Sequence, residues 1–436
     1  MSSTRSGAKP VQIAAAVIGN ALEWYDFIVF GFFTAIISRL FFPTQSPYAS
    51  LLLATATFGV GFFMRPVGGI LLGIFADRKG RKAALLLIIA LMTAAIALIG
   101  FAPTYAAIGL AAPLIIVFAR LLQGFATGGE FASATAFLIE SAPAGRRGFY
   151  GSWQMVGQCL AALIGAVIGA LLTRSLAPEA LDSWGWRVPF LAGLAIGPVG
   201  LFIRSHVEET KPFLESRRAE RERPRLGASL VSHYRETLVS TGLVVAATIQ
   251  FYVVLLYMPT FASTELHLPL GQAFLAQAIG LVCMTVLTPC FGALSDHVGR
   301  KPVLLAALVL YLALTYPLFL WVHEDPSFRN FLIMQITLCS VLGIASGPFS
   351  TAVAEQFPAH VRSTGVAIAY NAAVMCFGGF AQFFVTWLIE VTGSPIAPAF
   401  YVMFGTVCGL AAALFLKDGA DESRLPVAAG LNAASN

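Results

Sequence analysis

A few charged side chains interrupt long apolar segments, and these are the residues whose types and spacing could do chemistry. Glu23 and Asp26 are three residues apart, so on a helix they share a face, which Asn20 extends. Arg65 and Arg120 interrupt two other apolar segments. A charged side chain near the centre of a bilayer costs roughly 2.5–3.5 kcal/mol on insertion scales, so such residues are expected to face the protein interior and to have a function. A carboxylic acid can exchange a proton, and a guanidinium group can bind a carboxylate through two parallel hydrogen bonds.

Neutral polar side chains accompany these charges. Gln123 and Glu130 follow Arg120 at helical intervals, and Gln154 and Gln158 are one helical turn apart. Such side chains can bind an anion or can form polar contacts between helices, and the sequence leaves both interpretations open. The candidate substrate-binding residues are Asn20, Arg65, Arg120, Gln123, Gln154, Gln158, Gln250, Tyr252, Tyr370 and Asn371.

No residue pattern in the sequence indicates catalysis or metal binding. The six histidines fall in loops or at the ends of apolar segments without ligand spacing. The six cysteines lie inside apolar stretches without a CxxC pair, which is typical of buried small hydrophobic residues. We therefore expect no enzyme, no metal site and no organic cofactor.

The composition predicts an integral membrane protein. Of the 436 residues, 58% are hydrophobic and 11% are charged, against roughly 45–50% and 25% in soluble domains. At about 20 residues for each span, this length accommodates about a dozen spans. Apolar runs of that length predict helices, because irregular backbone cannot face lipid. The expected spans are approximately 12–39, 50–76, 83–102, 108–140, 148–173, 187–204, 237–260, 271–293, 301–321, 328–355, 363–390 and 397–416.

The distribution of Lys and Arg predicts the orientation of these spans. Twenty-one of the 27 Lys and Arg residues lie in loops on one side, and four lie on the other side. Positively charged residues accumulate in cytoplasmic loops, so both termini are expected in the cytoplasm.

An internal repeat divides the chain into two halves. The segment Gly73–Lys82 recurs as Gly292–Lys301, and Glu140–Arg146 recurs as Glu355–Arg362 at nearly the same offset. The expected fold class is an all-α polytopic membrane protein with twelve transmembrane helices in two six-helix halves. The expected division is a tail at 1–11, helical bundles at 12–204 and 237–417, a polar linker at 205–236 and a tail at 418–436.

The charged residues of the repeated segments predict a gate on the cytoplasmic side. After the second span of each half, an acid, a glycine turn and a basic pair can bind the ends of neighbouring helices. The alternative is that the basic residues only follow the usual distribution of positive charge. The candidate gate residues are Asp77, Arg78, Arg81, Glu140, Arg146, Asp296, Arg300, Glu355 and Arg362.

With these repeated motifs, the chain resembles the major facilitator superfamily of secondary transporters. Five further motifs resemble those of its metabolite:proton symporter family: Gly19–Phe27, Gly61–Pro66, Arg120–Glu130, Gly148–Gln154 and Trp184–Phe190. Members of that family import citrate and related carboxylates, oxoglutarate, shikimate, or proline and betaines. The motifs look most similar to those of citrate and tricarballylate symporters, although Gly128–Glu130 and Tyr257–Pro259 also resemble betaine and proline carriers.

The resemblance implies a role for the intramembrane charges. In related proton symporters, an acid of the first helix and an arginine of the fourth form the proton-linked pair, and these positions correspond to Asp26 and Arg120. We expect Asp26 to pair with Arg120 when ionised and to release it when protonated. A permanent salt bridge is the alternative. Glu23 and Glu130 are candidates for a second proton carrier or for helix packing.

The expected substrate is a small organic anion, because Arg65 and Arg120 would give the cavity two fixed cations. Moving an anion into a negative interior costs about 2.3 kcal/mol per charge per 100 mV, so protons are expected as the coupling ion. A symporter for proline or betaine, or for shikimate or oxoglutarate, is one alternative, and a drug-efflux antiporter is another. The resemblance also implies a functional monomer in the bacterial inner membrane, in contact with lipid and without a nucleic-acid partner.

Overall fold

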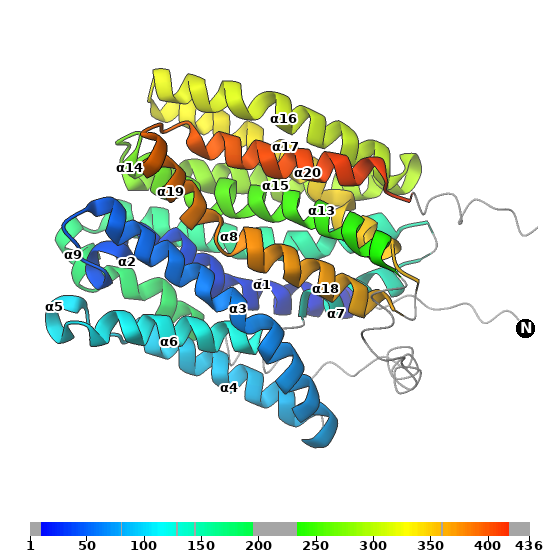
Figure 1. Cartoon of the computed structure of the whole chain (residues 1–436), viewed down its shortest axis with the longest axis horizontal. Helices are drawn as coiled ribbons and strands as arrows, with labels where there is room; N and C mark the ends of the chain where they lie inside the picture. Colours follow the sequence, from blue (N-terminus) through cyan, green and yellow to red (C-terminus); the bar gives the residue numbers. More distant parts are fainter. Residues whose placement is uncertain are drawn as a thin grey trace, which may run out of the picture.

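The computed structural model describes residues 10–79, 81–127, 130–143, 145–194, 233–358 and 361–417. Within these ranges the chain is a bundle of helices without any strand, in agreement with the predicted all-α class. Most of the helices run along the long axis of the molecule (Figure 1). We call the end of the bundle at which α1 (Pro10–Phe32) begins and α20 (Ala397–Leu414) ends the terminal end, and the opposite end the far end.

The remaining elements follow in chain order. The first half contains α2 (Thr34–Phe41), α3 (Pro47–Lys79), α4 (Arg81–Gly100), α5 (Tyr105–Ile108), α6 (Ala111–Ala126), α7 (Glu130–Glu140), α8 (Arg147–Ser175), α9 (Pro178–Ser183) and η1 (Gly185–Arg187). The second half contains α13 (Tyr234–Gln250), η3 (Phe251–Tyr257), α14 (Met258–Thr264), α15 (Leu270–Val298), α16 (Arg300–Glu324), α17 (Phe328–Glu355), α18 (Arg362–Ala373), η4 (Val374–Gly378) and α19 (Ala381–Thr392).

Eleven of the twelve predicted spans can be followed in the described residues. Eight helical stretches are long and apolar enough to cross a membrane, and α1 with α2, which meet at a 60° bend, form a ninth. The third and fourth predicted spans correspond to the shorter helix α4 and to α6 followed by α7. Of the sixth span, residues 188–194 are described and are helical.

Three spans are interrupted close to the middle of the bundle. The fourth predicted span changes from α6 to α7 after Ala126, and the seventh and eleventh contain the π-helical stretches η3 and η4. By contrast, Pro66, Pro289 and Pro348 lie inside unbroken helices. Because π-helical turns occur often at functional sites, the interruptions indicate where to look for one.

The backbones of α3 and α6 touch, and this contact brings two buried arginines together. A Cβ atom at Gly124 would overlap the carbonyl oxygen of Gly61, so only glycine fits at this crossing. Small residues allow helices in membranes to approach in this way. As a result, Arg65 of α3 and Arg120 of α6 reach the same aromatic ring.

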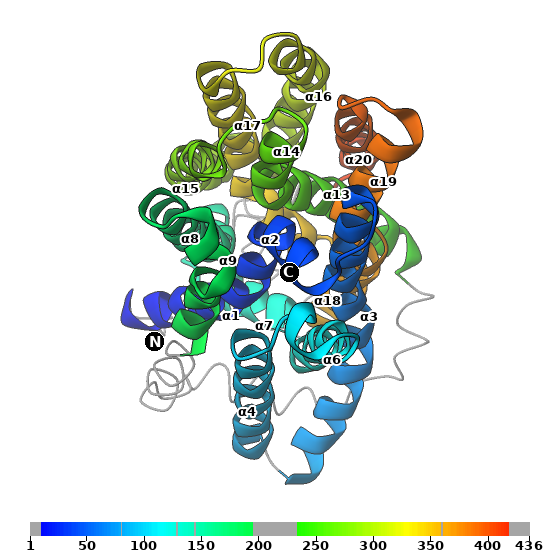
Figure 2. The same cartoon turned by 90° about the vertical axis from the view of Figure 1, so that its left-hand side faces the viewer.

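Helices from the two halves of the chain meet along two lines. In Figure 2, α8 lies beside α15, and α3 lies near α19. The first contact extends to the terminal end, where Gly148 of α8 and Gly292 of α15 approach so closely that neither has room for a side chain. At the far end, the hydroxyl of Tyr48 donates to both carboxylate oxygens of Glu265, at 2.9 and 3.1 Å.

Candidate functional site

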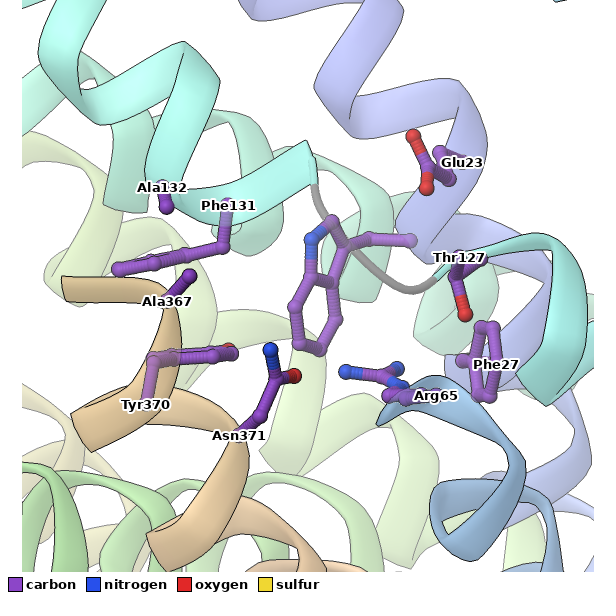
Figure 3. A pocket seen from close by; sticks show the side chains of 10 residues that line it. Glu23, Phe27, Arg65, Thr127, Phe131, Ala132, Ala367, Tyr370 and Asn371 are labelled. Carbon is purple, nitrogen blue, oxygen red and sulfur yellow. The ribbon is translucent and has the colours of Figure 1, made fainter. Parts of the chain in front are cut away.

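A pocket of about 420 Å³ lies between α1, α3, α18 and the junction of α6 with α7. Figure 3 shows side chains from these elements around one space. The pocket contains one cation, one acid and several aromatic rings. Its lining residues are Glu23, Trp24, Phe27, Arg65, Thr127, Phe131, Ala132, Ala367, Tyr370 and Asn371.

Arg65 supplies the positive charge of this pocket. Its side chain is buried, and its guanidinium carbon lies 5.6, 4.7 and 4.3 Å from the ring centres of Trp24, Phe27 and Phe62. Cation–π contacts with three rings hold the guanidinium in place and offset part of its lost hydration. Its Nε has no hydrogen-bond partner among the described residues. Since the guanidinium points into the pocket in Figure 3, it is available to bind an anion.

Glu23 supplies the negative charge. It enters the pocket from α1, with Thr127 between it and Arg65 in Figure 3, while Tyr370 and Asn371 enter from α18. A pocket with one acid and one cation can bind a ligand that carries both charges. It can also bind an anion, most favourably when the acid is protonated.

Arg120 lies outside the lining of the pocket. Its side chain is 0% exposed, and its guanidinium carbon lies 4.7, 4.6 and 4.8 Å from the ring centres of Phe27, Phe30 and Phe58. One terminal nitrogen donates to Oε1 of Gln123 at 2.8 Å, and the other donates to the carbonyl oxygen of Phe58 at 3.2 Å. Phe27 is therefore shared by Arg120 and Arg65, and only Arg65 reaches the pocket.

Asp26 is buried on α1 but is not ion-paired with Arg120 in this conformation. Among the described residues, its carboxylate has no hydrogen-bond or ion-pair partner, although it lies within electrostatic range of Arg120. A Cβ atom at Gly193 would overlap Oδ1 of Asp26, so the carboxylate packs against the backbone of the sixth predicted span. Tyr25 joins the same two segments by donating from its hydroxyl to the carbonyl oxygen of Pro189 at 3.0 Å.

Several of the other predicted binding residues carry buried N–H groups without a partner. Asn20 of α1 packs against Gly157 of α8, which lies between Gln154 and Gln158 in the sequence. The buried side-chain nitrogens without a hydrogen-bond partner among the described residues include those of Asn20, Gln123, Gln154 and Gln158. Each such donor is costly to leave unpaired, so these side chains are suited to bind an anionic or polar ligand.

The structure places the remaining predicted residues elsewhere. Gln250 donates to the hydroxyl of Thr406 at 2.9 Å and lines a second, mostly apolar cavity of about 300 Å³. Tyr252 packs its ring on Phe58 and Phe62. Glu130 begins α7, and its side chain lies outside the described residues. Within the described ranges, no group of three or more His, Cys, Asp or Glu side chains could hold a metal ion.

The predicted gate residues of the second half form a cluster at the terminal end. Asp296 accepts hydrogen bonds from the backbone N–H groups of Gly148 and Phe149, at 2.7 and 2.9 Å, and so binds the N-terminus of α8. Arg300 pairs with Asp296 at 2.9 Å and with Glu355 at 3.4 Å. This cluster, Asp296–Arg300–Glu355, ties the second half of the chain to the first.

A second contact between the halves involves Glu140 of α7 and Arg362 of α18, whose charged atoms lie 3.6 Å apart. Arg78 and Arg146 are exposed. The side chains of Asp77 and Arg81 fall outside the described residues. The structure thus brings together five of the nine predicted gate residues.

The sequence did not identify the aromatic lining of the pocket. Trp24, Phe27 and Phe131 line it, yet Phe131 and Phe27 are two of 35 phenylalanines in an apolar chain. The position of Trp24 beside Glu23 was the one available signal. The Tyr48–Glu265 contact at the far end was also missed, because nothing in the sequence relates the start of α3 to the end of α14.

Comparison with known proteins adds the family and its relatives. The family model described as Major Facilitator Superfamily matches residues 16–381 and 243–434. The citrate-proton symporter of Klebsiella pneumoniae is 37% identical, over 95% of this chain and 94% of that protein. The one from Salmonella typhi is also 37% identical, over 91% of this chain and 92% of that protein. The proline/betaine transporter of Escherichia coli K12 is 32% identical, over 94% of this chain and 84% of that protein.

Solved structures show a similar arrangement of helices. The D-xylose-proton symporter superposes with a TM-score of 0.70, over 93% of this chain and 96% of that chain. A partially occluded inward open conformation of the Escherichia coli xylose transporter gives the same TM-score. The sequence identities are 21% and 20%, so this likeness concerns the fold alone.

The buried cluster at the terminal end predicts a large loss of stability when its cation is removed. Arg300→Gln would leave the carboxylates of Asp296 and Glu355 buried without their ion-pair partner. Such a change costs roughly 3–5 kcal/mol, so the unfolding temperature of the purified protein in detergent should fall clearly. Lys417→Gln, which breaks an exposed pair with Glu236, is the matched control and should cost at most about 1 kcal/mol. Equal losses in both variants would contradict the account.

Proposed function

The chain belongs to the major facilitator superfamily, and on that premise we propose that it is a proton-coupled symporter for an organic anion, citrate or a related tri- or dicarboxylate. The predicted family and fold class are confirmed by the family match and by the curated relatives, which are transporters. The proposed mechanism is alternating access, with the pocket facing first one side of the membrane and then the other.

The observation that carries this assignment is the guanidinium of Arg65, the one cation among the residues that line the described pocket. A guanidinium fixed on three rings presents its N–H groups in a geometry that matches a carboxylate. The buried side-chain nitrogens of Asn20 and Gln154, which have no hydrogen-bond partner among the described residues, support the same assignment. Gln158 supports it through its interaction with Tyr370 of the pocket. A tricarboxylate offers enough acceptors for all of these donors.

Proton coupling follows from the charges that surround Arg120 and Arg65. These two cations share Phe27, and both an ionised Asp26 and a bound anion would reduce the repulsion between them. Protonation of Asp26 removes one of these two anions, so the proton and the substrate anion favour each other's binding. This reciprocal coupling is what a symporter requires.

The conformation of the structure suits the protonated form of Asp26. A buried carboxylate without a partner is costly unless it is neutral, and Asp26 has none among the described residues. When Asp26 is ionised, moving toward Arg120 gives its carboxylate a favourable electrostatic interaction. This is the Asp26–Arg120 pair that the sequence analysis predicts. Protons also compensate the charge of the substrate, since each negative charge costs about 2.3 kcal/mol per 100 mV on entering a negative interior. No organic cofactor takes part in this scheme.

Zwitterion import is a second candidate function. Glu23 and Arg65 provide opposite charges in one pocket, and Trp24, Phe131 and Tyr370 provide ring faces that attract a quaternary ammonium group. A betaine carries both a carboxylate and such a group. Relatives that transport proline and betaine fit this second candidate. A drug-efflux antiporter for lipophilic cations is disfavoured by Arg65 in the pocket.

The proposal includes the surroundings of the chain. It functions as a monomer in the bacterial inner membrane, with lipid around the bundle and the terminal end toward the cytoplasm. The two sequence repeats correspond to bundles at 12–204 and 237–417, which rock against each other about the pocket. The cluster Asp296–Arg300–Glu355 and the pair Glu140–Arg362 then close the cytoplasmic side, whereas Tyr48 with Glu265 closes the outer side.

The function is tested by uptake of radiolabelled citrate into proteoliposomes under an imposed inward proton gradient. We expect accumulation that is blocked most strongly by tricarballylate, more weakly by succinate, and least by shikimate, oxoglutarate, proline and betaine. If proline or betaine is accumulated instead of citrate, the zwitterion candidate replaces the anion candidate. Failure of the gradient to drive any of these compounds would contradict proton symport.

The role of Arg65 is tested by Arg65→Lys, which keeps the charge but removes the planar pair of donors. Loss of a charge-assisted hydrogen bond costs roughly 1.5–3 kcal/mol, so calorimetric titration should show citrate binding weakened about tenfold or more. The matched control is Arg187→Lys, because Arg187 also lies on a ring, 4.5 Å from the centre of Trp186, but outside the pocket. Unchanged citrate affinity in Arg65→Lys would remove Arg65 from the binding site.

The role of Asp26 is tested by Asp26→Asn, which mimics the protonated acid permanently. We expect gradient-driven citrate accumulation to be lost, while exchange of internal for external citrate remains detectable. Asp182→Asn is the matched control, since Asp182 is a partly exposed acid paired with Arg39 at the far end. Gradient-driven accumulation at the unmodified level in Asp26→Asn would show that another acid carries the proton.

A further inference from the structure

Two aromatic rings from opposite halves of the chain stack within the pocket lining. The ring of Phe131 on α7 lies parallel to that of Tyr370 on α18, with centres 3.8 Å apart and planes at 9°. Both side chains are buried, and both line the pocket (Figure 3). For the pocket to communicate with the terminal end between these helices, the rings must separate.

The stack belongs to a contact with two layers. Phe131 precedes Glu140 by nine residues on α7, and Tyr370 follows Arg362 by eight residues on α18. Glu140 and Arg362 form the ion pair at the terminal end. At about 1.5 Å per residue, the ring pair lies about 12–14 Å deeper along the same two helices. One antiparallel contact therefore has a charged outer layer and an aromatic inner layer.

Each ring belongs to a short helix that has an interruption of its span at one end. α7 begins at Glu130, one residue before Phe131, after the interruption that follows Ala126. α18 ends at Ala373, three residues after Tyr370, where the π-helical stretch η4 begins. Both ring-bearing helices lie on the terminal side of their breaks. They can therefore move while the parts of these spans beyond the breaks, including Arg120, stay in place.

The geometry of the stack suits a contact that is broken and remade. A near face-to-face arrangement is less favourable than an offset or edge-to-face arrangement, so the rings exclude water and solutes without locking the helices together. The charged outer layer is partly exposed and is correspondingly weak.

We infer that Phe131 and Tyr370 form an inner gate that closes the pocket toward the cytoplasm, and that separation of the two rings releases the substrate on that side. This inference rests on the proposed transport function and on its orientation. Phe131 and Tyr370 act here as gating residues, and the charge of the substrate remains bound by Arg65.

The gate is tested with a reporter that does not depend on the substrate. Thr127→Cys places a thiol in the pocket lining of a protein whose six native cysteines are replaced by alanine. In inside-out vesicles, an impermeant maleimide approaches from the cytoplasmic side. We expect Phe131→Ala and Tyr370→Ala to raise the labelling rate at least tenfold, and Phe131→Tyr and Tyr370→Phe to leave it within about twofold.

Trp153→Ala is the matched control, because Trp153 packs on Phe149 in a ring pair of α8 outside the pocket. Its labelling rate should stay at the background level. Equal labelling of the reporter with and without the two rings would overturn the inference. Since labelling requires no citrate, this failure is distinct from a failure of citrate uptake, which would concern the proposed function.

A cross-link gives a second test, because a covalent bond joins the two helices in place of the rings. Phe131→Cys with Tyr370→Cys, in the same cysteine-free background, places two thiols at the stack. Oxidation by copper phenanthroline should join them and reduce citrate exchange by at least 90%, with recovery after addition of a reductant. Each single cysteine variant should be insensitive to the oxidant. Full exchange by the cross-linked protein would contradict the gate.

Discussion

The guanidinium groups of Arg65 and Arg120 lie 4.7 Å from the same ring, and the rest of the site depends on keeping these two like charges inside an apolar bundle. Their repulsion is strong where water is excluded. Phe27 and its neighbouring rings replace part of the lost hydration, and the glycine contact between α3 and α6 fixes how near the charges come. Any anion that enters this region relieves the repulsion. In the proposed mechanism, an ionised Asp26 and a bound carboxylate each relieve this repulsion, and this shared effect couples the proton to the substrate.

The two ends of the bundle carry different kinds of polar contact. At the terminal end, a buried cluster of Asp296, Arg300 and Glu355 binds a helix N-terminus. At the far end, a tyrosine hydroxyl binds a single carboxylate. In the proposed mechanism, opening either end breaks the polar contacts of that end. The conformation that the protein prefers would then depend on the difference in free energy between these two sets of contacts.

The sequence predicted the elements that carry the site better than it predicted the directions of the side chains. Hydropathy and the cost of buried charge located Asp26, Arg65 and Arg120, because few other charges interrupt the apolar segments. Whether an arginine reaches the pocket depends on which face of its helix points toward the pocket once the helices pack. Arg65 lines the pocket and Arg120 does not, a difference that the sequence did not reveal. Apart from Trp24 beside Glu23 and the predicted Tyr370, the aromatic lining had no signal in the sequence, since a ring that faces a ligand has the same identity as one that faces lipid. Asp296 was found from its repeat, but its partners are backbone N–H groups, which no residue type reveals.

The hydrogen bonds from backbone N–H groups to Asp296 have a consequence for sequence evolution. Asp296 accepts hydrogen bonds from the main chain of α8 at Gly148 and Phe149, so the donors are present for every residue type except proline, which has no backbone N–H. Space further restricts position 148, where a side chain would collide with Gly292. The side chain at position 149 can therefore change during evolution while the hydrogen bonds persist. By contrast, loss of the carboxylate of Asp296 would remove both bonds. Duplicated halves can diverge in sequence under such a rule and still recognise each other.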